Sequence, residues 1–308
     1  MRLCLSIAPP GESESCYHFR HHVLKPSEGK MYKVVSLILA IALSGCADKI
    51  PVGQTPEPII TPPADLKASM DNQTLNKLNQ LLALRAAAPT EQQQDSGQMI
   101  DLLSRPFLGT PYVANMLIGS QNTPEKLVID FRGLDCFTYI DYVDALRQAS
   151  SQADFVQRLT HIRYASGEIS FLQRKHFFSD WSHQAKTNVT DITATLSPHT
   201  VTLVKNLNQK SDGSSYLPGL KNVQRSITYL PSDFIDDKVL AQLRTGDYIG
   251  IYTHLAGLDV THTGIYIMTE NGPVLRNASS RKENMQVVDS PFMDYVLATP
   301  GIVVFRAK

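Results

Sequence analysis

Apolar side chains in the first half of the chain recur every three or four positions, the spacing of one helix face. This spacing predicts a helix over 72–88 that ends at Pro89, with Leu75, Leu78 and Leu82 on its apolar face. Thr90 and Gln93 have the spacing of a capping box, which predicts a second helix that stops before Pro106. A later helix is marked by Phe155, Leu159 and Ile162.

The last third of the chain has short, β-branched and aromatic runs separated by turn residues, which predict strands. The expected strands are 247–253, 260–268, 273–276, 285–288 and 301–306. A further short strand is expected over 126–131, and short strands are expected on an insertion at about 155–230. A helical half followed by a strand-rich half indicates an α+β fold with an antiparallel sheet or partial barrel.

A turn at residues 133–135 leads into a helix whose entrance is Cys136. Asp135 is a strong N-cap residue, so Cys136 is expected in the first helical turn. The backbone N–H groups and the helix dipole favour a thiolate there, although the neighbouring carboxylate opposes it. The position is compatible with a cysteine nucleophile and equally with a buried structural cysteine.

Charge excludes one class of partner. Lys and Arg together number 29, as do Asp and Glu, so the formal net charge is zero. Without a basic field or a Gly-rich phosphate loop, we expect no nucleic-acid partner. No cofactor is expected.

The segment 31–45 has the features of a signal peptide. Met31 and Lys33 precede an apolar run at 34–43, which is too short to span a bilayer. The run ends in Leu43-Ser44-Gly45-Cys46, which resembles the bacterial lipobox, in which the protein is cut before a cysteine that then carries lipid. An ordinary cleaved signal is the alternative. Ala47 is not acidic, which favours the outer membrane, facing the periplasm, over the inner membrane.

The segment upstream of Met31 fits a signal peptide badly, because residues 1–30 are mixed and charged. We therefore expect 1–30 to be a non-native extension. Residues 46–66 form a lipidated, proline-rich tether, and 67–308 form a single catalytic domain. If translation starts at Met31, the protein lacks Cys4 and Cys16, and Cys46 carries the lipid. Cys136 would then keep the one unmodified thiol of an exported protein, which favours a functional role.

A thiol nucleophile needs a base and a group that orients the base. His262 lies within a predicted strand, whereas His254 follows one and is expected at a mobile hairpin tip. Asn277 follows the next strand and is the candidate orienting group, with Asp259 as its competitor. A metal site of His254, Asp259 and His262 is a further alternative, without a supporting ligand motif.

Five short motifs occur in one order along the chain, and together they resemble the NlpC-type papain-like cell-wall hydrolases. They are Gly109-Thr110-Pro111-Tyr112, Leu134-Asp135-Cys136, Arg244-Thr245-Gly246-Asp247, Thr261-His262-Thr263-Gly264 and Asn277-Ala278-Ser279-Ser280. More narrowly, the N-acetylmuramoyl-L-alanine amidase-like branch is resembled by Asp135-Cys136-Phe137-Thr138-Tyr139 and by Asn277-Ala278-Ser279-Ser280. The resemblance implies a papain-like fold with the catalytic cysteine at a helix N-terminus, a triad of Cys136, His262 and Asn277, and a substrate pocket bordered by Tyr112 and Asp135.

The implied function is hydrolysis of an amide bond in peptidoglycan or muropeptides by a lipid-anchored monomer in the bacterial envelope. The amide that joins sugar to peptide is the expected bond. Cleavage at a γ-D-glutamyl bond within the stem peptide, and a catalytically silent wall-binding lipoprotein, are the alternatives. The sequence departs from compact members of the group in Phe137-Thr138 after the cysteine and in the long interval from Cys136 to His262.

Overall fold

The structure is a computed structural model that describes residues 70–183 and 187–308. The predicted upstream extension, the signal peptide, Cys46 and the tether all lie outside these residues. None of the helices in the described part of the chain combines the length and the hydrophobicity that a membrane span requires.

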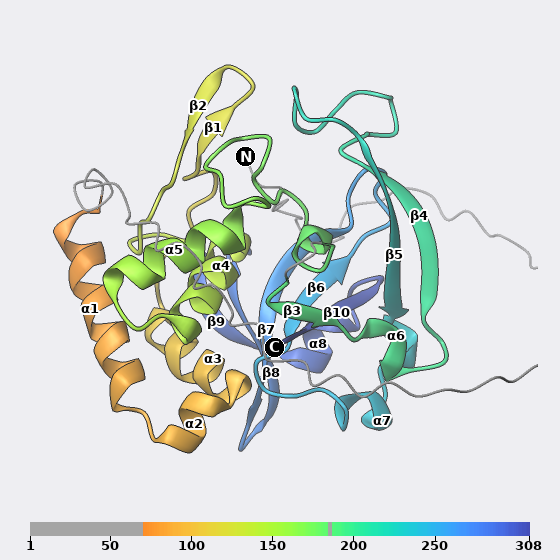
Figure 1. Cartoon of the computed structure of the whole chain (residues 1–308). Coiled ribbons are helices and arrows are strands. Elements are labelled where there is room, and N and C mark those ends of the chain that lie inside the picture. Colours follow the sequence, from red (N-terminus) through yellow and green to blue (C-terminus); the bar gives the residue numbers. More distant parts are fainter. Residues whose placement is uncertain (1–69, 184–186) are drawn as a thin grey trace, which may run out of the picture. The chain divides into compact units, whose positions relative to one another are not determined.

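Helices form the first half of the described chain (Figure 1). They are α1 (Asn72–Ala87), α2 (Thr90–Gln94), α3 (Ser96–Ser104), α4 (Cys136–Gln148) and α5 (Gln152–Arg163). The predicted helices at 72–88 and around Phe155 are therefore confirmed. The predicted capping box of Thr90 is wrong: Gln93 donates to Ala88 O instead, and Asp95 caps a separate helix, α3. The expected single helix is divided at Asp95, because the Asp95 side chain accepts a hydrogen bond from the backbone N–H of Gln98 at 3.0 Å and so starts a new helix.

An eight-stranded sheet follows, with path order β4-β5-β10-β6-β7-β8-β9 and with β3 also pairing with β10. Its strands, all paired antiparallel, are β3 (Val189–Asp191), β4 (Val201–Leu207), β5 (Val223–Pro231), β6 (Tyr248–Tyr252), β7 (Val260–Thr269), β8 (Gly272–Ser279), β9 (Gln286–Pro291) and β10 (Gly301–Ala307). The α+β class with an antiparallel sheet is thus confirmed. The segment expected to be an insertion supplies β3 to β5 of this sheet.

The strand expected over 126–131 is wrong. The structure has a hairpin of β1 (Ile118–Ser120) and β2 (Thr123–Lys126), after which residues 127–131 pair with no strand. Side chains bind this backbone instead: Tyr142 Oη accepts from Asp130 N, and Thr74 Oγ1 accepts from Phe131 N. The apolar residues of this segment are buried because they pack under the helices. The sequence pattern of a short apolar run does not distinguish this kind of burial from burial in a strand.

Two apolar clusters cover the faces of the sheet. On β6, Tyr248 and Tyr252 belong to the cluster shared with α1 and α3 to α5, whereas Ile249 and Ile251 belong to the second cluster. This alternation is the period of two that a strand imposes. The second cluster also contains Phe292 and Val296 of α8 (Phe292–Val296), while α6 (Thr193–Leu196) and α7 (Asp237–Leu240) add Leu196 and Val239.

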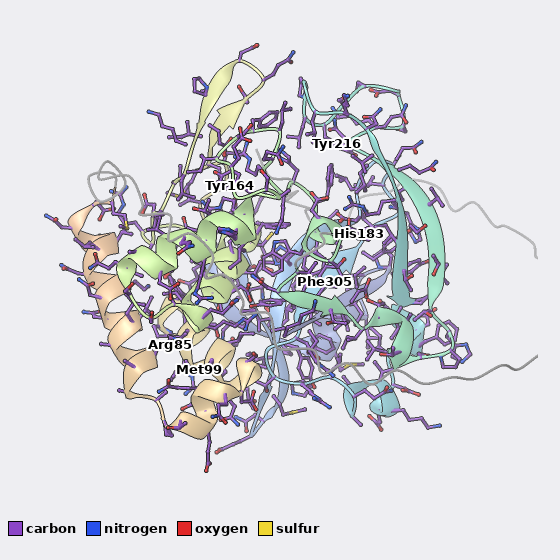
Figure 2. The ribbon with its side chains drawn as sticks, in the orientation of Figure 1. Arg85, Met99, Tyr164, His183, Tyr216 and Phe305 are labelled. Carbon is purple, nitrogen blue, oxygen red and sulfur yellow. The ribbon has the colours of Figure 1, made fainter. Side chains whose placement is uncertain are left out.

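Aromatic rings join the sheet to the helices. Phe305 of β10, labelled in Figure 2, stacks on Phe178, with ring centroids 4.3 Å apart and an interplanar angle of 9°. Phe178 and Trp181 lie in the short helix η3 (Phe178–Trp181) and are 1% and 4% exposed. The ring centroid of Phe137 in α4 lies 6.4 Å from that of Phe178 and 6.1 Å from that of Trp181, so these rings join the sheet to α4.

Candidate active site

Cys136 is the first residue of α4, as predicted. Asp135 caps the helix: its Oδ1 accepts from Phe137 N at 3.1 Å and from Thr138 N at 2.7 Å, and Thr138 Oγ1 accepts from Asp135 N at 3.0 Å. This reciprocal box satisfies N–H groups that a helix start leaves without helical partners. Asp135 is 4% exposed, and its carboxylate thus serves first to define where the helix begins.

The sulfur of Cys136 is in a disulfide bond in the structure. This differs from the expectation that Cys136 keeps its thiol. The other three cysteines of the sequence lie outside the described residues. Since the thiolate is the nucleophilic form of cysteine, any attack by this sulfur requires the bond to be reduced first.

Thr263 fastens the start of α4 to the sheet. Its hydroxyl Oγ1 donates to the backbone carbonyl of Cys136 at 2.9 Å, and both residues are buried. Thr263 follows His262 directly on β7, so this bond brings the strand that carries His262 against the turn that carries Cys136. The sequence analysis did not identify this contact.

His262 and Asn277 meet across β7 and β8. His262 Nε2 lies 2.9 Å from Asn277 Oδ1. The Asn277 amide is oriented by its own Nδ2, which donates to Leu275 O at 2.9 Å and to Ser290 Oγ at 3.2 Å. Because Oδ1 can only accept, Nε2 carries the imidazole proton, and Nδ1 keeps its lone pair. This is the tautomer of a base that is oriented by a neutral partner.

The surroundings of His262 favour the neutral imidazole. Burial lowers the pKa of His262 to about 4, opposed by the hydrogen bond to Asn277 and reinforced by the positive charge of Arg281. The ring is 8% exposed and stacks on Tyr295. At neutral pH the side chain therefore has the protonation state that accepts a proton.

The competing groups have other partners. Asp259 accepts from Ser179 N at 2.7 Å and from Val260 N at 2.8 Å, so it holds η3 against the sheet. His254 is exposed, but its loop is held in place: Lys205 Nζ donates to the carbonyls of Thr253, Leu255 and Leu258. His254 therefore lies in the loop of the β6–β7 hairpin, as predicted, and the buried Lys205 binds the backbone of this loop.

Metal-ligating side chains do not gather at this place. Within residues 70–183 and 187–308, no three His, Cys, Asp or Glu side chains form a group that could hold a metal ion. His254 and Asp259 therefore do not assemble with His262 into the ligand set that the sequence left open.

Tyr112 lies beside the start of α4. Val113 N donates to Leu134 O at 2.9 Å and Leu134 N donates to Pro111 O at 3.0 Å, so the Tyr112 segment runs alongside the residue before Asp135. Burial and the Asp135 charge raise the pKa of Tyr112 to about 12, so its hydroxyl keeps its proton at neutral pH. Tyr112 and Asp135 are thus neighbours, as the predicted pocket border requires.

Comparison with known proteins identifies the family. A family model of N-acetylmuramoyl-L-alanine amidase-like proteins, named AmiA-like, matches residues 102–302. This range contains every residue proposed above for the site. The chain belongs to the AmiA-like family. No curated protein matched the chain.

Solved structures agree with this family. An N-acetylmuramoyl-L-alanine amidase from Bacteroides uniformis is 29% identical, with a TM-score of 0.59, over 69% of this chain and 99% of that chain. A Legionella pneumophila protein is 21% identical, with a TM-score of 0.63, over 78% of this chain and 96% of that chain, and shares the fold. AmiA-like membership supports a hydrolase that acts on a peptidoglycan-type substrate.

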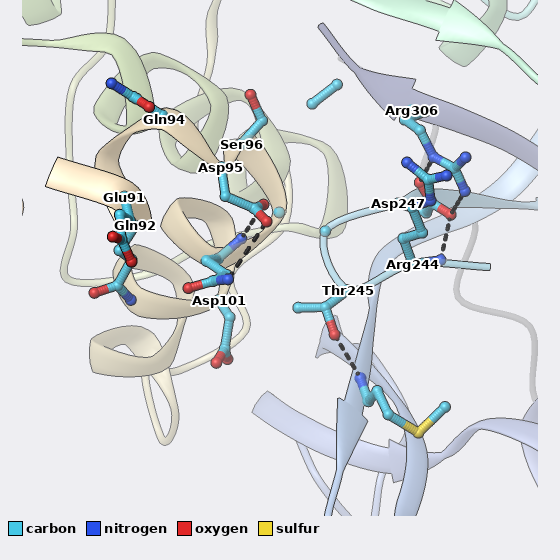
Figure 3. Close-up of a pocket in the computed structure, with 15 residues that line it drawn as sticks. Glu91, Gln92, Gln94, Asp95, Ser96, Asp101, Arg244, Thr245, Asp247 and Arg306 are labelled. Carbon is cyan, nitrogen blue, oxygen red and sulfur yellow. Dashed lines mark hydrogen bonds and ion pairs between the residues drawn. The ribbon is translucent and has the colours of Figure 1, made fainter. Parts of the chain in front are cut away.

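A groove of about 950 Å³ lies elsewhere on the AmiA-like domain, between α2 and α3 on one side and residues 244–247 on the other (Figure 3). Its charged groups are largely paired: Arg306 binds Asp247 at 2.7 Å, and Asp95 caps α3. None of the predicted site residues lines it.

Three residues of the site escaped the sequence analysis: Thr263, Tyr295 and Arg281. Thr263 lies inside a quoted motif, and a polar residue beside a buried histidine was a usable signal. Tyr295 and Arg281 are distant from any motif histidine in sequence, so only the fold brings them to His262.

Proposed function

We propose that this AmiA-like protein hydrolyses the amide bond between N-acetylmuramic acid and L-alanine in muropeptides, with Cys136 as nucleophile, on a papain-like NlpC-type scaffold. The observation that carries the proposal is the hydrogen bond of His262 Nε2–H to Asn277 Oδ1. His262 lies on β7, and the next residue of that strand, Thr263, binds Cys136 O. The bond to Asn277 leaves the lone pair of Nδ1 to act as the base for a cysteine at a helix start.

In the first half-reaction, the reduced Cys136 thiol gives its proton to His262 Nδ1, and the sulfur attacks the amide carbonyl carbon. The oxyanion receives a hydrogen bond from the backbone N–H of Cys136, a type of donor worth about 3 kcal/mol. His262 then returns the proton to the nitrogen of L-alanine, so the C–N bond breaks and a thioester remains. Asn277 keeps the ring in the required tautomer throughout.

In the second half-reaction, His262 takes a proton from water, whose oxygen attacks the thioester carbonyl. The C–S bond breaks and the sulfur recovers the proton. The products are a lactyl carboxylate on the sugar and a free peptide amine. Tyr112 and Asp135 border the pocket in which the peptide is held.

The test is mass spectrometry of defined muropeptides, including anhydro-sugar fragments, after incubation with the purified protein or its Cys136→Ala variant. Each is assayed with and without a thiol reductant, because the sulfur must be reduced to act. We expect free stem peptide only from the reduced, unmutated protein. Cleaved stems would move the function to a γ-D-glutamyl endopeptidase, and equal activity of both proteins would exclude the cysteine mechanism. Unchanged substrates would favour a catalytically silent wall-binding lipoprotein.

We also propose that the mature protein starts at a lipidated Cys46 and faces the periplasm from the outer membrane. The support is the lipobox-like run 43–46 after an apolar segment. Fractionation of cells that express the protein or its Cys46→Ala variant tests this. We expect the protein in the outer-membrane fraction and the variant outside it. Recovery of both in the same fraction would contradict the anchor.

A further inference from the structure

A tyrosine from a separate helix covers the imidazole of His262. Tyr295 belongs to α8, and its ring centroid lies 5.9 Å from that of His262 at an interplanar angle of 22°. Both side chains are 8% exposed. A near-parallel ring restricts rotation of the imidazole about its own axis, in addition to the hydrogen bond at Nε2.

A cation lies on the same tyrosine. The guanidinium carbon of Arg281 is 4.1 Å from the centroid of the Tyr295 ring, a distance at which a cation and the ring attract each other. Tyr295 therefore contacts both Arg281 and His262, and the positive charge of Arg281 lowers the pKa of the imidazole in addition to the larger effect of burial. A like charge disfavours the imidazolium form.

The turn that carries Arg281 is fixed to the rest of the site. Arg281 O accepts from the backbone N–H of Asn284 and of Met285, each at 2.9 Å. Met285 O in turn accepts from Tyr112 N at 2.9 Å. The position of Arg281 is thus coupled to the segment that borders the predicted substrate pocket.

Other titratable groups approach His262 from the remaining elements. Cys136 lies at the start of α4, and Tyr112 precedes it in the loop before α4. His176 and Asp259 line, with His262, a small cavity between η3 and the sheet. Asp259 is buried, burial raises its pKa, and its carboxylate accepts from the backbone N–H groups of Ser179 and Val260. Arg281 is therefore the cation placed to act on this histidine.

We propose that Tyr295 and Arg281 are positioning residues for the base of this site: the stacked ring fixes the plane of His262, and the guanidinium adds to the effect of burial in favouring the neutral imidazole. Neither residue needs to touch the substrate. The inference rests on the proposed function of His262 as a base. It assigns a role to the turn after β8 and to α8, which carry none of the residues proposed for the triad or the pocket border.

The experiment titrates His262 directly and measures activity in parallel. The full chain, labelled with ¹³C histidine and kept reduced, is titrated by NMR, and the His262 signal is assigned by its loss in His262→Gln. Arg281→Gln removes the charge, and Arg281→Lys retains it. Lys282→Gln is the matched control, because Lys282 is exposed in the same turn and carries the same charge.

We expect Arg281→Gln to raise the His262 midpoint by about one pH unit, and Arg281→Lys and Lys282→Gln to change it by less than about a third of that. Equal shifts in Arg281→Gln and Lys282→Gln would overturn the proposal, because the effect would then be one of general surface charge.

The stacking role has its own variants. Tyr295→Leu is expected to lower kcat on muropeptides about tenfold with little change in KM, since ring orientation matters after binding. Tyr295→Phe keeps the ring and should retain activity. Equal loss in both variants would overturn the stacking role, and the Arg281 titration still decides the charge role if Tyr295→Leu does not fold. A shifted titration in a protein that cleaves no muropeptide would instead contradict the proposed function alone.

Discussion

The two ends of α4 lie against different kinds of buried polar group: an ion pair at the C-terminal end and a neutral hydrogen-bonded pair on the strand at the N-terminal end. At the C-terminal end, Asp144 Oδ1 lies 2.6 Å from Arg147 Nε, and these side chains are only 1% and 6% exposed. Tyr248 Oη donates to the same carboxylate oxygen at 2.9 Å, and Arg147 also donates to Lys308 O at 3.1 Å. At the N-terminal end, Thr263 of β7 binds the Cys136 carbonyl, and the residue before it on the strand is His262, which burial keeps neutral and which is bound to a neutral amide.

This difference separates anchoring from chemistry. The charges at the C-terminal end compensate each other, so they hold α4 to β6 and to the end of the chain in one protonation state. The groups at the N-terminal end can gain or lose a proton, because burial disfavours the imidazolium of His262 without preventing it. Damage at the first end should therefore reduce stability, and damage at the second should reduce activity.

The largest effect is expected from His262→Ala, which removes the proposed base. Turnover of muropeptide should fall about 10⁴-fold, or about 5 kcal/mol of transition-state stabilisation. His254→Ala is the control, since His254 is exposed on the β6–β7 loop and should leave the rate within about twofold. Steady-state kinetics of both variants check this, and similar rates in the two would remove His262 from the mechanism.

Next in size is Asp144→Ala at the other end of α4. It leaves the buried Arg147 guanidinium without its carboxylate, which should lower the free energy of unfolding by about 3–5 kcal/mol. Urea denaturation monitored by circular dichroism measures this change. Activity per folded molecule should remain near that of the unmutated protein. A selective loss of activity with unchanged stability would show that the two ends are not separate in this way.

Acid should affect the N-terminal end specifically. An unfolded histidine binds a proton below about pH 6.5, whereas His262 in the folded protein does so only near pH 4. The unfolded state thus binds more protons in this window, and stability should fall as the pH decreases from 6.5 to 4, by up to about 3 kcal/mol. His262→Gln should flatten this part of the curve of unfolding free energy against pH. An unchanged curve would mean that the pKa of His262 is the same in the folded and in the unfolded protein.

A smaller effect is expected from Thr263→Val, which removes the hydroxyl bound to Cys136 O while keeping the shape of the side chain. The buried carbonyl loses its partner, at a cost of about 1–2 kcal/mol in the free energy of unfolding. Thr202→Val on the exposed face of β4 is the control and should change stability by less than about 0.5 kcal/mol. Thermal melts of both variants decide whether the contact matters.

The sequence was informative wherever a local pattern decides local structure. Asp135 at the N-cap, with the apolar spacing that follows, defines the start of α4, because capping depends on residues two or three positions away. The β-branched and aromatic runs between turn residues likewise predicted the strands β6 and β7. Local pattern misled at 126–131, where the apolar run is buried by packing under helices and not by pairing in the sheet.

Tertiary structure alone decided the contacts between distant residues. The sequence offered both Asn277 and Asp259 as partners of His262, and only the register of β7 on β8 selects Asn277. Tyr295 and Arg281 reach the imidazole through α8 and the turn after β8, and Thr263 reaches Cys136 through packing of α4 on the sheet. Composition and spacing specify which chemistry a chain can perform, but long-range packing selects the partners that give each group its protonation state.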